Sequence, residues 1–179
     1  MKSFKYILLL LITGLLLGYS PDDYYYNPSN YRAIIMKRSE LDKGIFADSP
    51  RNIVNTGKIY YKDSLIFLGE RFKGFHVIDN HDPSNPVNVG FISIPGSIDI
   101  SIKGTYLYTD NATDLISIDI SEFPNSVAIT KRIEKIFPEP TPPDLNFIPY
   151  IFSKDKRPRN TVIVNWVKED NRENSDFNE

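Results

Sequence analysis

The chain has 179 residues, of which 41% are hydrophobic and 25% are charged, a composition typical of one globular domain with a single core. Its formal net charge of −2 excludes the strongly basic surface of a nucleic-acid-binding protein. The absence of cysteine excludes disulfide bonds, thiol nucleophiles and cysteine-ligated metal centres. With 11 tyrosines, 11 phenylalanines and 13 prolines, the composition favours strands broken by turns over long helices.

Residues 1–20 have the organisation of a secretory signal peptide. Two lysines precede a run of Leu and Ile that stops before Pro21, and this run is too short for a membrane-spanning helix. Leu-Leu-Gly at 16–18 resembles the start of a bacterial lipoprotein box, but Tyr19 stands where the lipidated cysteine would follow. We therefore expect no lipid attachment. The chain is predicted to be exported to the periplasm, the outer membrane or the cell surface, with membrane contact only through this segment if it stays uncleaved.

The segment 21–35 is predicted to be a tyrosine-rich tether that leads into a first strand. A helix of one or two turns should follow, with Ser39 as its cap and Gly44 at its end. We place the main β-domain at 36–167 and a disordered acidic tail at 168–179.

The central region consists of eight short runs of β-forming residues separated by turn formers. Strands are predicted at 58–61, 64–69, 74–79 and 87–94, and again at 97–102, 105–109, 115–120 and 127–133. Alternation of apolar and polar residues in 98–102 and 115–120 predicts one buried face. A shift of 40 residues lays the second set on the first, with 66–68 falling on 106–108 and Asp79 on Asp119. Four strands in a repeat of about 40 residues are typical of a β-propeller blade.

The strand that ends in Asp79 and its counterpart that ends in Asp119 resemble the LVIVD repeat of bacterial exported proteins. In the first copy a turn rich in proline follows, with Asp82, Pro83 and Pro86. We predict a turn role for these five residues, because Asp bonds its own backbone and Pro fixes the exit of a strand.

The likeness covers roughly 36–167 and implies an all-β, LVIVD-type, β-propeller-like fold in a lipoprotein of unknown function. The fold would contain two four-stranded units and terminal strands. Two units are too few to close a propeller. Either a terminal strand at 161–167, anchored by Trp166, covers the open edges, or several chains assemble.

Histidines and carboxylates are the candidates for chemistry. His76 should face opposite to Phe75 and Val77 on its strand, and the loop 79–82 lacks the spacing of a calcium site. The chain has no nucleophile elbow and no phosphate-binding glycine loop. We therefore expect no catalytic residue, metal or cofactor. Carboxylate pairs for glycoside hydrolysis could still be drawn from several acids: Glu70, Asp79, Asp110, Asp114 and Asp119.

The sequence thus predicts an exported cell-envelope β-repeat module, not an enzyme, that binds an unknown protein or glycan. Aromatic residues are the candidate contacts, although about half should be core residues instead; they are Tyr60, Tyr61, Phe72, Tyr106 and Tyr108. One alternative is an envelope or glycan-directed hydrolase that uses loop carboxylates. Another is a structural subunit of a larger β-assembly, including a homo-oligomer. The basic cluster at 154–159 is either a solvated loop or a contact for an anionic glycan or lipid headgroup.

Overall fold

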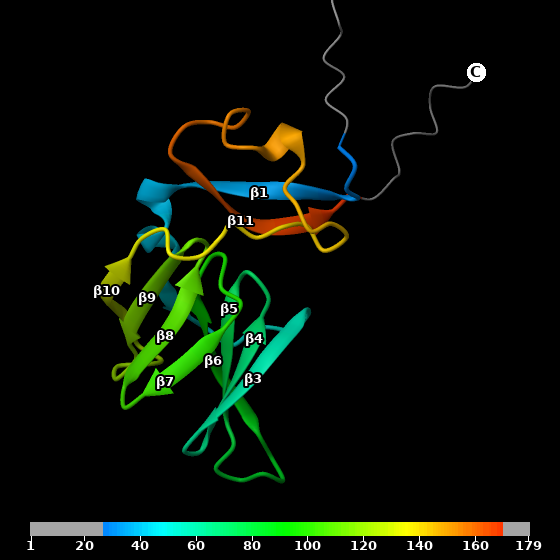
Figure 1. Ribbon diagram of the computed structural model, residues 1–179. Coiled ribbons are helices and arrows are strands. Elements are labelled where there is room, and N and C mark those ends of the chain that lie inside the picture. The colour runs from blue at the N-terminus through cyan, green and yellow to red at the C-terminus, as the bar shows by residue number, and fades with distance from the viewer. Residues whose placement is uncertain (1–26, 170–179) are drawn as a thin grey trace, which may run out of the picture.

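A computed structural model describes residues 27–169 of the chain (Figure 1). The predicted signal peptide with Tyr19, most of the tether and nearly all of the acidic tail lie outside the described residues. Within the described part, no helix is long or apolar enough to cross a membrane.

Two antiparallel sheets follow each other along the chain, and the all-β prediction is confirmed. The first sheet has the order β2-β6-β5-β4-β3, with β2 (Phe46–Asp48), β3 (Thr56–Lys62), β4 (Leu65–Glu70), β5 (Gly74–Asp79) and β6 (Val87–Ser93). The second has the order β10-β9-β8-β7, with β7 (Ile100–Lys103), β8 (Tyr106–Asn111), β9 (Asp114–Asp119) and β10 (Ala128–Ile133). The short strand β2 was not predicted, and it gives the first sheet a fifth strand.

The two ends of the described chain pair with each other. β1 (Tyr31–Lys37) and β11 (Thr161–Lys168) form an antiparallel ribbon that lies above both sheets in Figure 1. The terminal strand therefore does not cover an edge of either repeat sheet. Trp166 is buried in this ribbon and donates its Nε1–H to the carbonyl of Pro140 at 2.9 Å.

Three single-turn 3-10 helices complete the fold: η1 (Arg38–Glu40), η2 (Asp42–Gly44) and η3 (Tyr150–Phe152). The first two confirm the predicted helical turns. The prediction that Ser39 caps them is wrong, because η1 begins at Arg38 and has no side-chain cap.

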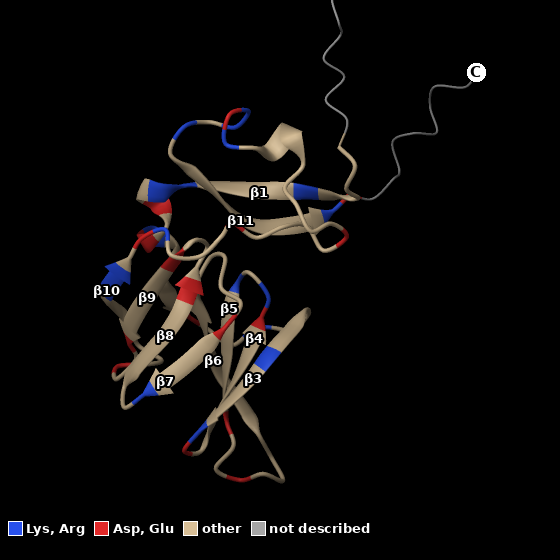
Figure 2. Cartoon of the chain, in the orientation of Figure 1, with Lys and Arg blue, Asp and Glu red and all other residues tan. Residues whose placement is uncertain are grey.

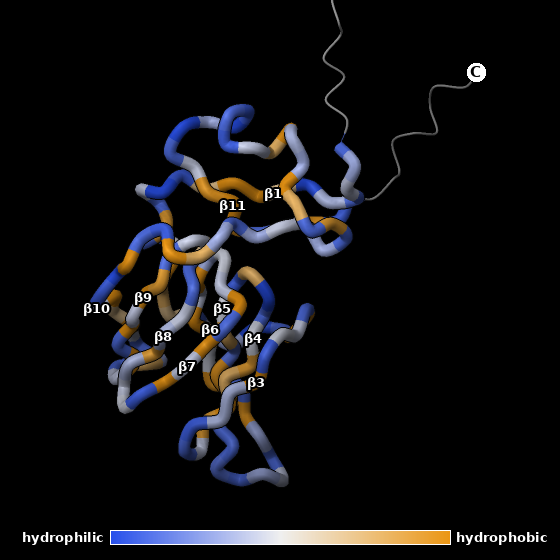
Figure 3. The backbone as a smooth tube through the Cα atoms, in the orientation of Figure 1, coloured by the Kyte–Doolittle hydropathy of each residue, from blue (hydrophilic) through white to orange (hydrophobic). Residues whose placement is uncertain are grey.

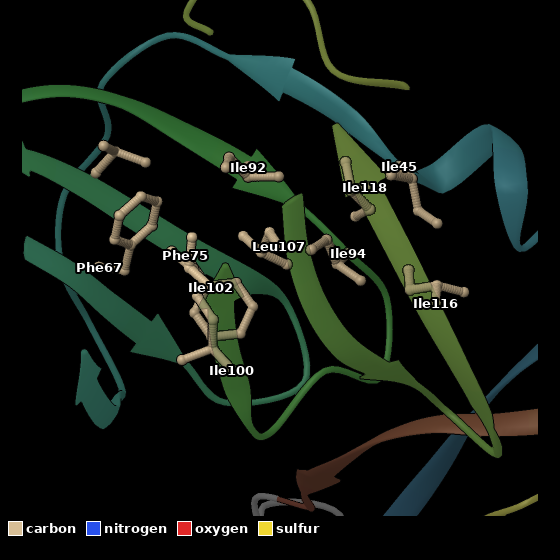
Figure 4. Close-up of a cluster of buried hydrophobic side chains, with 11 residues drawn as sticks. Ile45, Phe67, Phe75, Ile92, Ile94, Ile100, Ile102, Leu107, Ile116 and Ile118 are labelled. Carbon is tan, nitrogen blue, oxygen red and sulfur yellow. The ribbon is translucent and has the colours of Figure 1, made fainter. Parts of the chain in front are cut away.

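One core lies between the two sheets, which pack face against face (Figure 4). Strand alternation sends apolar side chains from both sheets into this layer, while the loops at the lower end of the sheets are mostly hydrophilic (Figure 3). Where β3 and β7 come close, the Tyr60 hydroxyl donates to the Ile102 carbonyl at 3.2 Å and Lys58 Nζ lies 2.6 Å from Asp99 Oδ2. The core residues are Ile45, Phe67, Phe75, Val77, Ile92, Ile94, Ile100, Ile102, Leu107, Ile116 and Ile118.

β3–β6, hereafter the first unit, and β7–β10, the second unit, repeat the same hydrogen-bond frame. Asp79 Oδ1 accepts from the backbone N–H of His81 at 2.9 Å, and Asp119 Oδ1 accepts from that of Ser121 at 3.0 Å, forty residues on. The N–H of Asn85 reaches the Asp82 carbonyl, as that of Asn125 reaches Glu122. Both units also carry a bulge between their third and fourth strands.

The shift between the units is not 40 residues everywhere. β5 lies 40 residues before β9, but β4 lies 41 residues before β8, because the intervening turn spans 71–73 in the first unit and only 112–113 in the second. The predicted superposition of 66–68 on 106–108 is therefore wrong by one residue. Phe67 corresponds to Tyr108, and Ile66 to Leu107.

Candidate functional site

The residue-by-residue correspondence between the two units defines two faces in each unit. The front face carries Phe67, Phe75 and Val77 in the first unit and the corresponding Tyr108, Leu115 and Ser117 in the second. The back face is the opposite one. The shared core is formed by the front of the first unit against the back of the second, so the back of the first unit and the front of the second remain outside it.

The back face of the first unit is apolar and open along the edge strand β3. Ile59 and Tyr61 on the edge strand β3 are 69% and 62% exposed, and they lie beside the half-buried Leu68 and Ile66 of β4. Ile78 continues this row on β5. Contiguous exposed apolar surface of this kind marks interaction sites on soluble proteins.

One end of this back face is closed by a buried ion network. Glu70 is 2% exposed and bonds to Lys73 Nζ at 2.6 Å, His76 Nε2 at 3.0 Å and Arg51 at 3.2 Å. Burial alone would raise the pKa of Glu70, but the hydrogen bonds from Lys73 and His76 and the charge of Arg51 bring the pKa below its ordinary value. The Arg51 guanidinium also lies 3.4 Å from the ring centroid of Phe91, so these residues cover that end of the sheet.

His76 does face away from Phe75 and Val77, as predicted, and it is fully buried. Its edge contacts Phe91 with 4.8 Å between the ring centroids, and Nδ1 has no partner within the described residues. This enclosed position offers no access to a substrate.

A second buried network lies at the corresponding end of the second unit. The side chain of Asp114 is fully buried and accepts from Arg38 at 2.8 Å, Arg132 at 2.7 Å and the N–H of Lys135 at 2.9 Å. Burial opposes ionisation, yet these donors lower the pKa of Asp114 overall. The contacts join η1, β9 and β10, so Asp114 connects three elements of the fold.

The front face of the second unit is mixed. Tyr106 and Tyr108 of β8 are 42% and 36% exposed and pair with Lys103 and Ser101 of β7. Ile133 of β10 is also exposed.

An open cleft of about 790 Å³ lies at the upper end of this front face. Phe72, Tyr108 and Phe137 line it together with Asp99 and Asp110; we call it the aromatic cleft. Burial raises the pKa of Asp110 despite backbone hydrogen bonds from Asp99 at 2.8 Å and Ile98 at 2.9 Å. The hydrogen bond from Lys58 lowers the pKa of Asp99.

The predicted contact residues do not form one site. Phe72 is buried at a φ of 66° and reaches the aromatic cleft, and Tyr60 bonds into the space between the sheets. Tyr61 lies on the free back of the first unit, whereas Tyr106 and Tyr108 lie on the free front of the second.

The predicted turn residues either end the third strand of a unit, as Asp79 and Asp119 do, or lie in the loop that follows it. Asp79, Asp82 and Asp119 accept hydrogen bonds from backbone N–H groups two residues further on. Pro83 and Pro86 lie exposed in this loop of the first unit. Among the described residues, no cluster of three His, Asp or Glu side chains is arranged to hold a metal ion.

Sequence reasoning missed the back face, although alternation in β3 could have placed Ile59 and Tyr61 on one side of the strand. No family model, curated protein or solved structure matches the chain.

Proposed function

We propose that this protein is an exported cell-envelope interaction module that assembles head to tail. In this assembly, the front of the second unit of one copy packs on the back of the first unit of the next, which extends an LVIVD-type, propeller-like arrangement beyond two units. The predicted signal peptide supports export.

The observation that carries this proposal is the equivalence of the two back faces. Ile59, Tyr61 and Ile78 of the first unit correspond to Ile100, Ile102 and Ile118 of the second, which are buried in the shared core. The same positions are thus buried by a neighbouring sheet in one unit and have no neighbouring sheet in the other. A front face is the complementary surface, because this is what the second unit binds within the chain.

Charge also fits this arrangement. Lys58 and Asp99 occupy corresponding positions, because each directly precedes one of the corresponding residues Ile59 and Ile100. Within the chain, Lys58 and Asp99 form an ion pair with each other. Head-to-tail packing would bring Asp99 of one copy to Lys58 of the next. The front face of the second unit combines polar and aromatic residues, as interfaces between separable subunits do. Lys103, Ser101 and Ser117 lie around Tyr106 and Tyr108.

Sedimentation analysis of the purified protein tests the proposal. The unmodified chain should form concentration-dependent oligomers, and Ile59→Lys should abolish them because a charge on the back face must be desolvated. Ile136→Lys is the matched control, since Ile136 is also exposed (46%) and lies outside both faces. An unmodified chain that stays monomeric at high concentration, or equal effects of the two variants, would contradict the proposal.

The aromatic cleft supports a second candidate, a hydrolase that acts on envelope glycans. The specific observation is that Asp110 has a raised pKa while Asp99, in the same cleft, has a lowered one, and such a split is characteristic of acid and base partners. Asp110→Asn should then abolish release of reducing sugar from envelope polysaccharide, with Asp119→Asn as a control outside the cleft. Hydrolysis that survives Asp110→Asn would eliminate this candidate.

A further inference from the structure

A second cleft, of about 1040 Å³, is lined by five cationic residues from three parts of the chain. Arg38 comes from η1, Lys135 from the segment after β10, and Lys154, Arg157 and Arg159 from the loop before β11. Figure 2 shows these basic segments along the left and upper parts of the molecule. We call it the basic cleft. The segment 137–141 contributes to both clefts.

Three of these cations are not neutralised. Arg38 binds Asp114 and Glu134, and Arg157 is buried in an ion pair with Glu139, the acidic residue that lines the cleft. In the described part of the chain, Lys135, Lys154 and Arg159 have no acidic partner within 4.0 Å. Three uncompensated positive charges therefore surround one cavity in a protein whose net charge is negative.

An unused hydrogen-bonding group lies in the same cavity. Ser153 lines the cleft, and its hydroxyl oxygen is shielded from solvent without a hydrogen-bond partner among the described residues. A buried hydroxyl without a partner is unfavourable. A turn of the Ser153 side chain toward the cleft would present this hydroxyl to an acceptor oxygen of a bound ligand.

We propose that the basic cleft binds a phosphate ester. Lys135, Lys154 and Arg159 would neutralise the phosphate, because arginine and lysine form strong charge-assisted hydrogen bonds to phosphate oxygens. The Ser153 hydroxyl would donate to one of these oxygens. The cleft is larger than a phosphate group and leaves room for further atoms of a ligand; a soluble sugar phosphate and a phospholipid headgroup share this chemistry. The site is independent of the sheet faces that the head-to-tail assembly uses.

Calorimetric titration of the whole protein with pyrophosphate tests the site. We expect saturable binding that weakens about tenfold or more in a Lys154→Ala, Arg159→Ala double variant, because two charge-assisted contacts are lost. The matched control is Lys43→Ala with Lys168→Ala, which removes the same charge from exposed positions outside the cleft and outside both sheet faces. Ser153→Ala, which removes only a hydroxyl, should weaken binding severalfold without lowering the melting temperature.

Vesicles distinguish the two sources of phosphate. Tighter binding to phosphatidylglycerol vesicles than to pyrophosphate, sensitive to the cleft variant and not to the control, assigns a lipid headgroup. Binding of pyrophosphate without binding to vesicles assigns a soluble phosphate-bearing ligand. Equal weakening by the cleft and control variants, or no binding to either probe at 150 mM salt, would overturn the proposal.

Discussion

The two units differ in which face they bury, although they share one hydrogen-bond frame. The front of the first unit is packed with Phe67, Phe75 and Val77, whereas the corresponding front of the second carries Tyr108, Leu115 and Ser117 at the surface. The back faces do not show the opposite pattern. The back of the second unit is covered by the first sheet, whereas that of the first unit is apolar along β3 and is covered only at one end, by the network around Glu70. The comparison teaches that burial in this fold is decided by the neighbouring sheet, not by the strand pattern of a unit alone.

The turns between the second and third strands show the same divergence. Gly74 and Asp114 occupy corresponding positions. Gly74 has a φ of 137°, and a Cβ atom there would lie 1.9 Å from the Ile92 carbonyl oxygen, so only glycine fits the longer turn. The turn that is one residue shorter accepts Asp114, whose carboxylate then organises a network of its own.

We expect the largest difference in unfolding free energy between corresponding variants of the two units on the front faces. Phe75→Ala should destabilise the fold by about 3–5 kcal/mol because it leaves a cavity in the shared core. Leu115→Ala, at the corresponding half-buried position, should cost about 1 kcal/mol. Urea unfolding of both variants measures this, and similar losses would show that the two fronts are not used differently.

Variants of the two buried ion networks should differ by a smaller amount in unfolding free energy. Asp114→Asn removes the buried carboxylate shared by Arg38 and Arg132 and leaves each arginine with one exposed partner, Glu134 or Asp42. Breaking this buried ion pair should cost about 3–5 kcal/mol. Glu70→Gln should cost less, about 1–3 kcal/mol, because Lys73 and Arg51 are partly exposed and can be solvated by water. Thermal unfolding compares the variants. A Glu70→Gln loss as large as that of Asp114→Asn would contradict this ranking.

Acidification should weaken both networks. Folding lowers the pKa of Glu70 and Asp114, so their contribution is complete above the unfolded pKa of about 4 and is lost as pH falls through the lower folded pKa. Asp110 acts in the opposite direction, since its folded pKa is raised. Urea unfolding from pH 7 to 2.5 should therefore show the difference between the unmodified chain and Asp114→Asn shrinking with acid. A constant difference would mean that ionisation of Asp114 does not stabilise the fold.

The strands and turns could be predicted because their signals are local. β-forming runs, alternation in 115–120 and the self-bonding of Asp79 and Asp119 depend on residues close in sequence. The superposition of 66–68 on 106–108 failed because a turn one residue shorter shifts the register, and one residue exchanges the two faces of a strand.

The candidate site was less predictable because it depends on long-range packing. Tyr60 and Tyr61 are neighbours in sequence, yet one points between the sheets and the other to the free back face. The pairing of β1 with β11 joins residues more than 100 positions apart, and the basic cleft likewise brings Arg38 near Lys154 and Arg159. No local pattern encodes which segment will lie opposite.

A mixing experiment tests the head-to-tail assembly most directly. Ile59→Lys blocks the back of the first unit, and Tyr106→Lys blocks the front of the second at a residue outside the aromatic cleft. Each variant alone should sediment as a monomer. An equimolar mixture should form a dimer and no larger species, because the intact front face of the Ile59→Lys variant can bind the intact back face of the Tyr106→Lys variant. A mixture that stays monomeric, or either variant still assembling alone, would contradict the account.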